Sequence, residues 1–112
     1  MIVIIESPFA GNVELNKKYL DAAILDCCLR GESPYASHKM LTDSLDDWNK
    51  EQRELGIKLG FEFHKVAKKV VVYTDLGISN GMKMGIKNAV ELCIPVEKRS
   101  LGKKWIKLMD LN

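Results

Sequence analysis

The sequence predicts an α/β fold in which a parallel sheet of about four strands carries helices on both faces. Two short apolar runs, residues 2–5 and 70–73, are β-branched almost throughout, which is typical of strands buried on both faces of a parallel sheet. Long segments with apolar residues at helical spacing separate the predicted strands. The chain of 112 residues is therefore expected to form one domain, residues 1–112, with the order β-α-β-α-β-α-β.

The first half of the chain follows this alternation closely. Residues 2–5 are expected as the first strand, and Asn12 as the N-cap of a helix that ends near Arg30. The sequence SPYAS, residues 33–37, predicts a short second strand. A polar stretch, residues 40–47, is expected to form a long loop that acts as a lid over the neighbouring site.

The second half begins with a long predicted helix, residues 48–67. Its apolar stripe is expected to face the core and consists of Leu55, Ile57, Leu59, Phe63 and Val66. A strand at residues 70–73 follows, then a helix capped by Ser79 that runs to about Leu92, and a last strand at residues 94–96. Trp48 and Trp105 are expected to pack on the core, with interface anchors as the alternative.

Composition excludes several classes of protein. The chain is 46% apolar and 29% charged, and its net charge of +2 is too small to indicate a nucleic-acid-binding surface. No apolar segment is long enough to span a membrane. Three cysteines without metal-ligand spacing are expected as reduced, buried thiols. The apolar start of the chain ends in a carboxylate and does not resemble a signal peptide, so we expect a cytoplasmic protein.

Ligands of parallel α/β sheets bind beyond the carboxyl ends of the strands, where the strand order reverses. This rule selects three loops before any motif is considered. In the first loop, a ligand is expected to contact Ser7, Pro8, Phe9, Gly11 and Asn12, with Phe9 stacking on a ring. In the second, His38 is expected on a loop as a hydrogen-bond donor, a general acid or a structural cap, whereas His64 is expected to be structural. Neither histidine has metal-ligand spacing.

The third loop lies in the stretch TDLGISNGMKMGI, residues 74–86. Asp75 is expected to accept hydrogen bonds from sugar hydroxyls. The start of the following helix favours an anion such as phosphate and contains Ser79, Asn80, Gly81 and Met82. The stretch contains neither a P-loop nor a dinucleotide fingerprint, so an ordinary capped helix is the alternative reading.

The chain resembles the small nucleoside 2-deoxyribosyltransferase-like proteins of bacteria and phages over residues 1–97. The resemblance depends on IIESPFAG, on SPYASH, and on Ile78, Ser79, Gly81, Met82, Ile86 and Ala89 within the third block. It implies a small Rossmann-like (flavodoxin-like) three-layer fold, a nucleotide-like ligand, no cofactor, and a homodimer or higher homo-oligomer whose neighbouring subunit completes the pocket.

The resemblance also implies a carboxylate nucleophile on the helix that Ser79 opens, at a position that is Gly85 in this sequence. This departure predicts a binding protein with a degenerate pocket, in which Gly85 permits close approach of a ligand or a helix. The resemblance implies a phage protein that sequesters a nucleotide immune signal in the host cytoplasm. Two alternatives stay open. One is an active nucleoside or nucleotide N-glycosidase or deoxyribosyltransferase that uses Glu6 or Asp75, and the other is a non-catalytic protein-interaction module.

Overall fold

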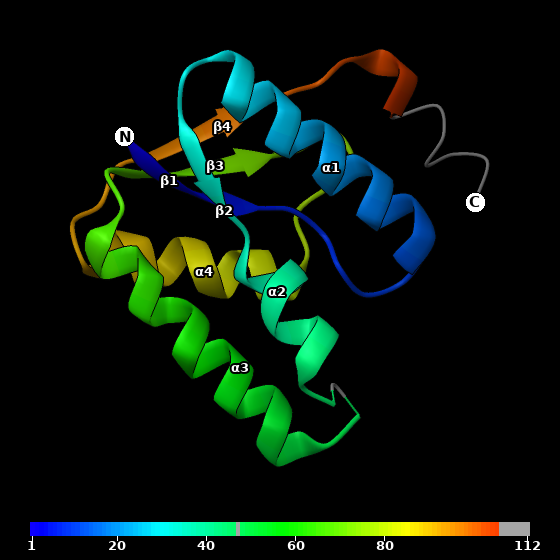
Figure 1. Ribbon diagram of the computed structural model, residues 1–112, viewed down its shortest axis with the longest axis vertical. Coiled ribbons are helices and arrows are strands. Elements are labelled where there is room, and N and C mark those ends of the chain that lie inside the picture. Colours follow the sequence, from blue (N-terminus) through cyan, green and yellow to red (C-terminus); the bar gives the residue numbers. More distant parts are fainter. Residues whose placement is uncertain (47, 106–112) are drawn as a thin grey trace.

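Figure 1 shows the computed structural model, which describes residues 1–46 and 48–105. Four parallel strands form one sheet with the order β2-β1-β3-β4. The elements, in chain order, are β1 (Ile2–Glu6), α1 (Val13–Leu29), β2 (Ser33–Tyr35), α2 (Ser37–Ser44), α3 (Lys50–Glu62), a 3-10 helix η1 (Phe63–Val66), β3 (Lys69–Tyr73), α4 (Asn80–Glu91) and β4 (Val96–Arg99). The predicted Rossmann-like (flavodoxin-like) class is confirmed.

The two faces of the sheet are covered by different helices (Figure 1). On one face, Val3 and Ile5 of β1 pack with Tyr19 of α1 in the first core cluster. On the other face, Ile4 packs with Met82 of α4 in the second cluster. Successive residues of a strand point to opposite faces, so residues two apart share a face. The next residue on the Ile4 face is therefore Glu6, the last residue of β1.

Strand order reverses beside β1, since β2 pairs with one of its edges and β3 with the other. Glu6 is the partner of Val72 in the register with β3. The carboxyl end of β1 therefore lies at the switch point of the sheet, where α/β folds bind their ligands.

Two strong local signals are confirmed at α1. Asn12 caps this helix, and its side chain accepts a hydrogen bond of 3.1 Å from the Leu15 N–H. Gly31 follows the helix with a φ of +80°, a conformation that suits glycine far better than other residues.

Two predicted boundaries are wrong. The stretch expected as a loop at residues 40–47 belongs in large part to α2, and Asp47 lies outside the described residues. This helix has no side-chain cap, so packing on α3 rather than local sequence holds it. The last strand runs from Val96 to Arg99 instead of over residues 94–96. It is a polar edge strand, and its Arg99 is buried and forms an ion pair with Glu32 (2.6 Å).

The prediction that the apolar stripe of the helix expected at residues 48–67 faces the core is also wrong for several of its residues. Leu55, Leu59 and Val66 are 44%, 41% and 63% exposed, although Phe63 does pack on the second core cluster. The face of α3 that is buried contains Gly60 instead. A β-carbon there would lie 2.9 Å from Oγ of Ser37, so the glycine allows α2 and α3 to pack closely.

Three smaller expectations have mixed outcomes. Cys27 is buried as predicted, whereas Cys28 and Cys93 are exposed. Trp105 packs edge-on against Tyr19, with ring centroids 5.2 Å apart, but Trp48 is 97% exposed and does not pack on the core. Within the described ranges, no helix combines the length and apolar character needed to cross a membrane.

Candidate functional site

A cavity of about 470 Å³ opens at the carboxyl end of β1, between α2, α3 and the start of α4. Its polar lining comes from the strand end, from the helix starts and from α3, and consists of Glu6, Ser7, Ser37, His38, Gln52, Arg53, His64, Ser79 and Asn80. Its apolar lining includes Phe9, Leu41, Leu45, Ile57, Phe61, Met82 and Met84. A largely apolar cavity with a few converging polar groups is typical of a small-molecule site.

Glu6 is the acidic group of this cavity. Neither a hydrogen bond nor an ion pair joins its carboxyl group to any other part of the chain that the structure describes. Burial raises the pKa of the Glu6 carboxyl from 4.5 to about 8, because a carboxylate in this position loses its hydration without gaining a partner. At neutral pH the group therefore holds its proton most of the time.

Gly85 makes room for this carboxyl group. A β-carbon on residue 85 would lie 2.6 Å from Cδ and 2.9 Å from Oε2 of Glu6, closer than real β-carbons approach other atoms. Gly85 is buried in the middle of α4, where glycine costs about 1 kcal/mol of helix stability relative to alanine. The close approach that the sequence predicted at Gly85 is thus made by an acidic side chain of the same chain.

Ser7 and His38 form the second polar element of the site. Ser7 Oγ and His38 Nε2 lie 2.8 Å apart and share a hydrogen bond that joins the end of β1 to the first turn of α2. Burial lowers the pKa of His38 to about 4, so the imidazole is neutral at physiological pH. His38 was predicted on a loop, and the structure places it on a helix at the same sheet edge.

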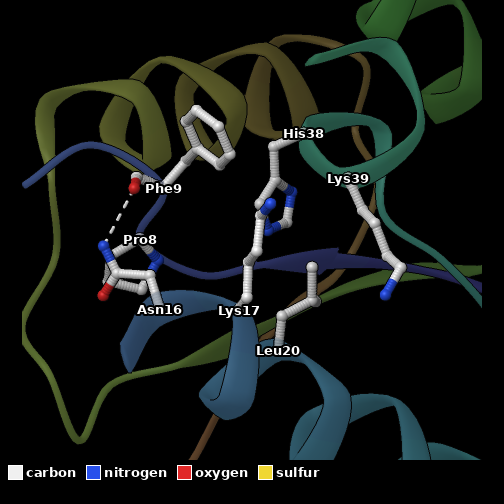
Figure 2. Close-up of a pocket in the computed structure, with 7 residues that line it drawn as sticks. All are labelled: Pro8, Phe9, Asn16, Lys17, Leu20, His38 and Lys39. Atoms are coloured by element: carbon white, nitrogen blue, oxygen red, sulfur yellow. Dashed lines mark hydrogen bonds between the residues drawn. The ribbon is translucent and has the colours of Figure 1, made fainter. Parts of the chain in front are cut away.

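A smaller cavity of about 110 Å³ adjoins the first, with Phe9 and His38 lining both. Figure 2 shows its seven lining residues. Asn16 holds the loop before α1 in place, since its amide donates hydrogen bonds to the carbonyl groups of Phe9 (3.0 Å) and Ala10 (2.9 Å). The lining is completed by Pro8, by Leu20 and by two lysines, Lys17 and Lys39.

The start of α4 forms another part of the wall of the larger cavity. Ser79 caps the helix and accepts a hydrogen bond of 3.3 Å from the Met82 N–H. Ser79, Asn80, Gly81 and Met82 all line the cavity. The first N–H groups of a helix have no acceptor within the helix, so this wall favours an anionic group.

Asp75 does not belong to this site. Its carboxylate accepts hydrogen bonds from the Tyr19 hydroxyl (2.7 Å), the Leu101 N–H (2.6 Å) and the Ser100 hydroxyl. Burial alone would raise the pKa of Asp75, but these hydrogen bonds hold it below its usual value. The side chain is buried against α1 and the segment after β4, and it lines neither cavity.

Three other predicted residues have structural positions. Gly11, with a φ of +95°, and Asn12, the cap of α1, line neither cavity. His64 is buried and shares a hydrogen bond of 2.6 Å with Asn88, which confirms its expected structural role, although it also contributes to the cavity wall. The described His, Cys, Asp and Glu side chains form no group of three or more that could hold a metal ion.

The contribution of α2 and α3 to the cavity was not predicted. Leu41, Leu45, Gln52, Arg53, Ile57 and Phe61 all line it. The available signal was the spacing of Gly56 and Gly60, four residues apart on one face of α3. Such spacing lets a second helix approach closely, and a β-carbon on Gly56 would lie 3.2 Å from Cδ1 of Leu45.

The comparisons with known proteins agree with this architecture. The solved structure of a 2-deoxyribosyltransferase from the psychrotolerant bacterium Bacillus psychrosaccharolyticus is similar with a TM-score of 0.71. The two chains are 17% identical, and the match covers 89% of this chain and 72% of that one. The resemblance is therefore confirmed at the level of the fold. No curated protein sequence matches the chain. The match of residues 1–99 to one family model shows that the chain belongs to the family described as Domain of unknown function (DUF7768).

Proposed function

We propose that the protein binds a nucleoside or nucleotide-derived molecule in the cavity at the end of β1. The observation that supports this function best is the cavity itself, whose volume of about 470 Å³ lies in the range of small-molecule sites. The similar fold of the 2-deoxyribosyltransferase supports the choice of ligand class.

Different walls of the cavity suit different parts of such a ligand. Phe9 offers a ring on which a base can stack, and the N–H groups at the start of α4 suit a phosphate. The sequence predicted that Asp75 binds the sugar hydroxyls, but the Asp75 oxygens already accept internal hydrogen bonds. The sugar hydroxyls would therefore contact Ser7 and Glu6 instead.

The proposal is tested by a thermal-shift screen with nucleosides, mononucleotides, cyclic dinucleotides and ADP-ribose isomers, followed by calorimetry on any compound that binds. A ligand at a hundredfold excess over its dissociation constant adds about 2.7 kcal/mol to the apparent stability. We expect Phe9→Ala to weaken binding by about tenfold or more, since stacking of one base contributes about 1–3 kcal/mol.

Trp48→Ala is the matched control, because it removes an aromatic ring that is 97% exposed and lines neither cavity. This variant should bind as tightly as the natural protein. If none of the compounds binds, or if the two aromatic variants weaken binding equally, the proposed function is wrong.

The biological role that goes with this proposal is sequestration of a nucleotide immune signal by a phage protein, which follows from the resemblance. Sequestration requires that the ligand be held and returned intact. Chromatography of the ligand recovered from the denatured complex checks this, with an ADP-ribose isomer and a cyclic dinucleotide as the compounds to load.

A further inference from the structure

We propose, on the basis of the proposed function, that the smaller cavity is a second, anion-binding part of the ligand site. Lys17 and Lys39 bind one phosphate group there, while the nucleoside part of the same ligand occupies the larger cavity. The ligand class is then a nucleotide that carries two phosphate groups at separate positions.

The two cavities are continuous in their lining and differ in size. Phe9 and His38 line both of them, and Figure 2 shows both side chains at the smaller cavity. The volume of the smaller cavity, about 110 Å³, is well below the range of about 300–1,000 Å³ for sites that hold a whole small molecule. It therefore suits one compact group of a ligand whose larger part lies in the neighbouring cavity of about 470 Å³.

The lining of the smaller cavity is cationic. Two helices each contribute a lysine, Lys17 from α1 and Lys39 from α2, and none of the described lining residues is acidic. In Figure 2 the Lys17 side chain extends from α1 in the direction of His38. A lysine ammonium group is a common phosphate ligand, because it provides a compact positive charge and three hydrogen-bond donors.

Both lysines are available to an anion. Lys17 is exposed, and no hydrogen bond or ion pair joins its ammonium group to another residue that the structure describes. Lys39 forms an ion pair of 2.9 Å with Asp21, in which the two side chains are 50% and 63% exposed. Exposed ion pairs contribute little to stability, so a phosphate group can replace Asp21 at small cost.

The larger cavity suits the rest of an anionic ligand. Glu6 is the acidic residue of its described lining, and burial raises the pKa of this carboxyl group to about 8, which keeps it mostly uncharged at neutral pH. Arg53 adds a cation from α3, and the first N–H groups of α4 favour a phosphate. The two cavities together therefore provide separate positive regions for two phosphate groups.

The test compares nucleoside 3′,5′-bisphosphates with the corresponding 5′-monophosphates by calorimetry, for the natural protein and three variants. Lys17→Ala and the double variant Lys17→Ala/Lys39→Ala remove the proposed phosphate contacts, and both side chains are exposed, so the fold should be retained. Lys18→Ala is the matched control. Lys18 is the next residue of α1, its side chain is 71% exposed, and it lines neither cavity.

We expect a bisphosphate to bind about tenfold or more tightly than its monophosphate, because its second phosphate accepts charge-assisted hydrogen bonds. Lys17→Ala should lose most of this advantage and the double variant all of it, while monophosphate binding stays unchanged in both. Lys18→Ala should keep the full advantage. The advantage should also shrink as the salt concentration rises, since salt screens exposed charges.

Three results would overturn the inference while leaving the binding function intact. They are a bisphosphate that binds no more tightly than its monophosphate, equal losses in Lys17→Ala and Lys18→Ala, and a double variant that weakens the binding of both compounds equally. If neither class of compound binds, the inference is wrong, and the proposed function fails with it only if nothing in the wider thermal-shift screen binds.

Discussion

The carboxyl group of Glu6 fills the space that a side chain on Gly85 would need. Glu6 ends β1 and Gly85 lies in the middle of α4, yet the β-carbon position of residue 85 is 2.6 Å from Cδ of Glu6. The two residues are 79 positions apart in the sequence, and neither alone indicates the other. Their fit sets the geometry of the cavity and can be tested by substitution at either position.

Substitution of Gly85 by alanine should act mainly on Glu6. The new methyl group would meet the end of a flexible side chain, so we expect the carboxyl group to move rather than the helix to unfold. Alanine adds about 1 kcal/mol of helix stability, and the forced movement of Glu6 should cancel most of it. In the Glu6→Ala background the methyl group has room, and Gly85→Ala should raise the free energy of unfolding by about 1 kcal/mol.

Urea unfolding of the four proteins in this cycle measures the coupling between the two positions. A coupling close to zero would show that the two side chains do not compete for the same space.

The stability of the protein should fall as the pH rises from about 4.5 to about 8 because of Glu6. The folded state holds the proton up to a pKa of about 8, whereas the unfolded chain releases it near 4.5. The unfolded state therefore binds fewer protons in this window, and the free energy of unfolding decreases by at most about 1.4 kcal/mol per pH unit.

This effect is measured as the difference between the natural protein and Glu6→Gln at pH 5.5 and pH 7.5. Both proteins contain the same histidines, so their titration cancels in the difference. A difference that is constant across this pH range would contradict the raised pKa.

Asp75 should be important for stability and not for ligand affinity. Its carboxylate joins Tyr19 of α1 to Ser100 and Leu101 after β4, and hydrogen bonds to a charged group contribute about 1.5–3 kcal/mol each. We expect Asp75→Asn to lower the free energy of unfolding by about 3 kcal/mol. The dissociation constant of any ligand found in the screen should not change.

Asp21→Asn serves as the control, because it removes only an exposed ion pair with Lys39 and should cost less than about 1 kcal/mol. If Asp75→Asn weakens ligand binding while the protein stays equally stable, the sugar-binding role first predicted from the sequence would be correct after all.

The parts of the fold with strong local signals were predictable. The β-branched runs identified β1 and β3, and Asn12 and Ser79 marked the starts of α1 and α4. Helix α2 could not be found this way, because it lacks a side-chain cap and depends on its contact with Gly60 of α3. Such a contact exists only after the chain has folded.

The candidate site was predictable in position but not in its choice of acid. Glu6 and Asp75 both follow buried strand residues, which made them look equivalent in the sequence. Their contacts separate them: Glu6 lies on the Ile4 face of β1, toward α4, whereas Asp75 lies in the turn after β3 and accepts a hydrogen bond from Tyr19 of α1. The contact with Gly85 depends in addition on how α4 packs on the sheet, which no local pattern encodes.

The exposed apolar stripe of α3 predicts a homo-oligomer. Leu55 and Leu59 of α3 are 44% and 41% exposed, and Val66 of the adjoining η1 is 63% exposed. Association of two copies would remove this apolar surface from water. We expect the natural protein to have at least twice its monomer mass of 12.7 kDa in light scattering, and Leu59→Glu to be monomeric. Leu29→Glu is the control, since it places the same charge at an exposed leucine at the end of α1 and should leave the mass unchanged. A monomeric natural protein, or equal effects of both substitutions, would show that the α3 stripe is not the interface.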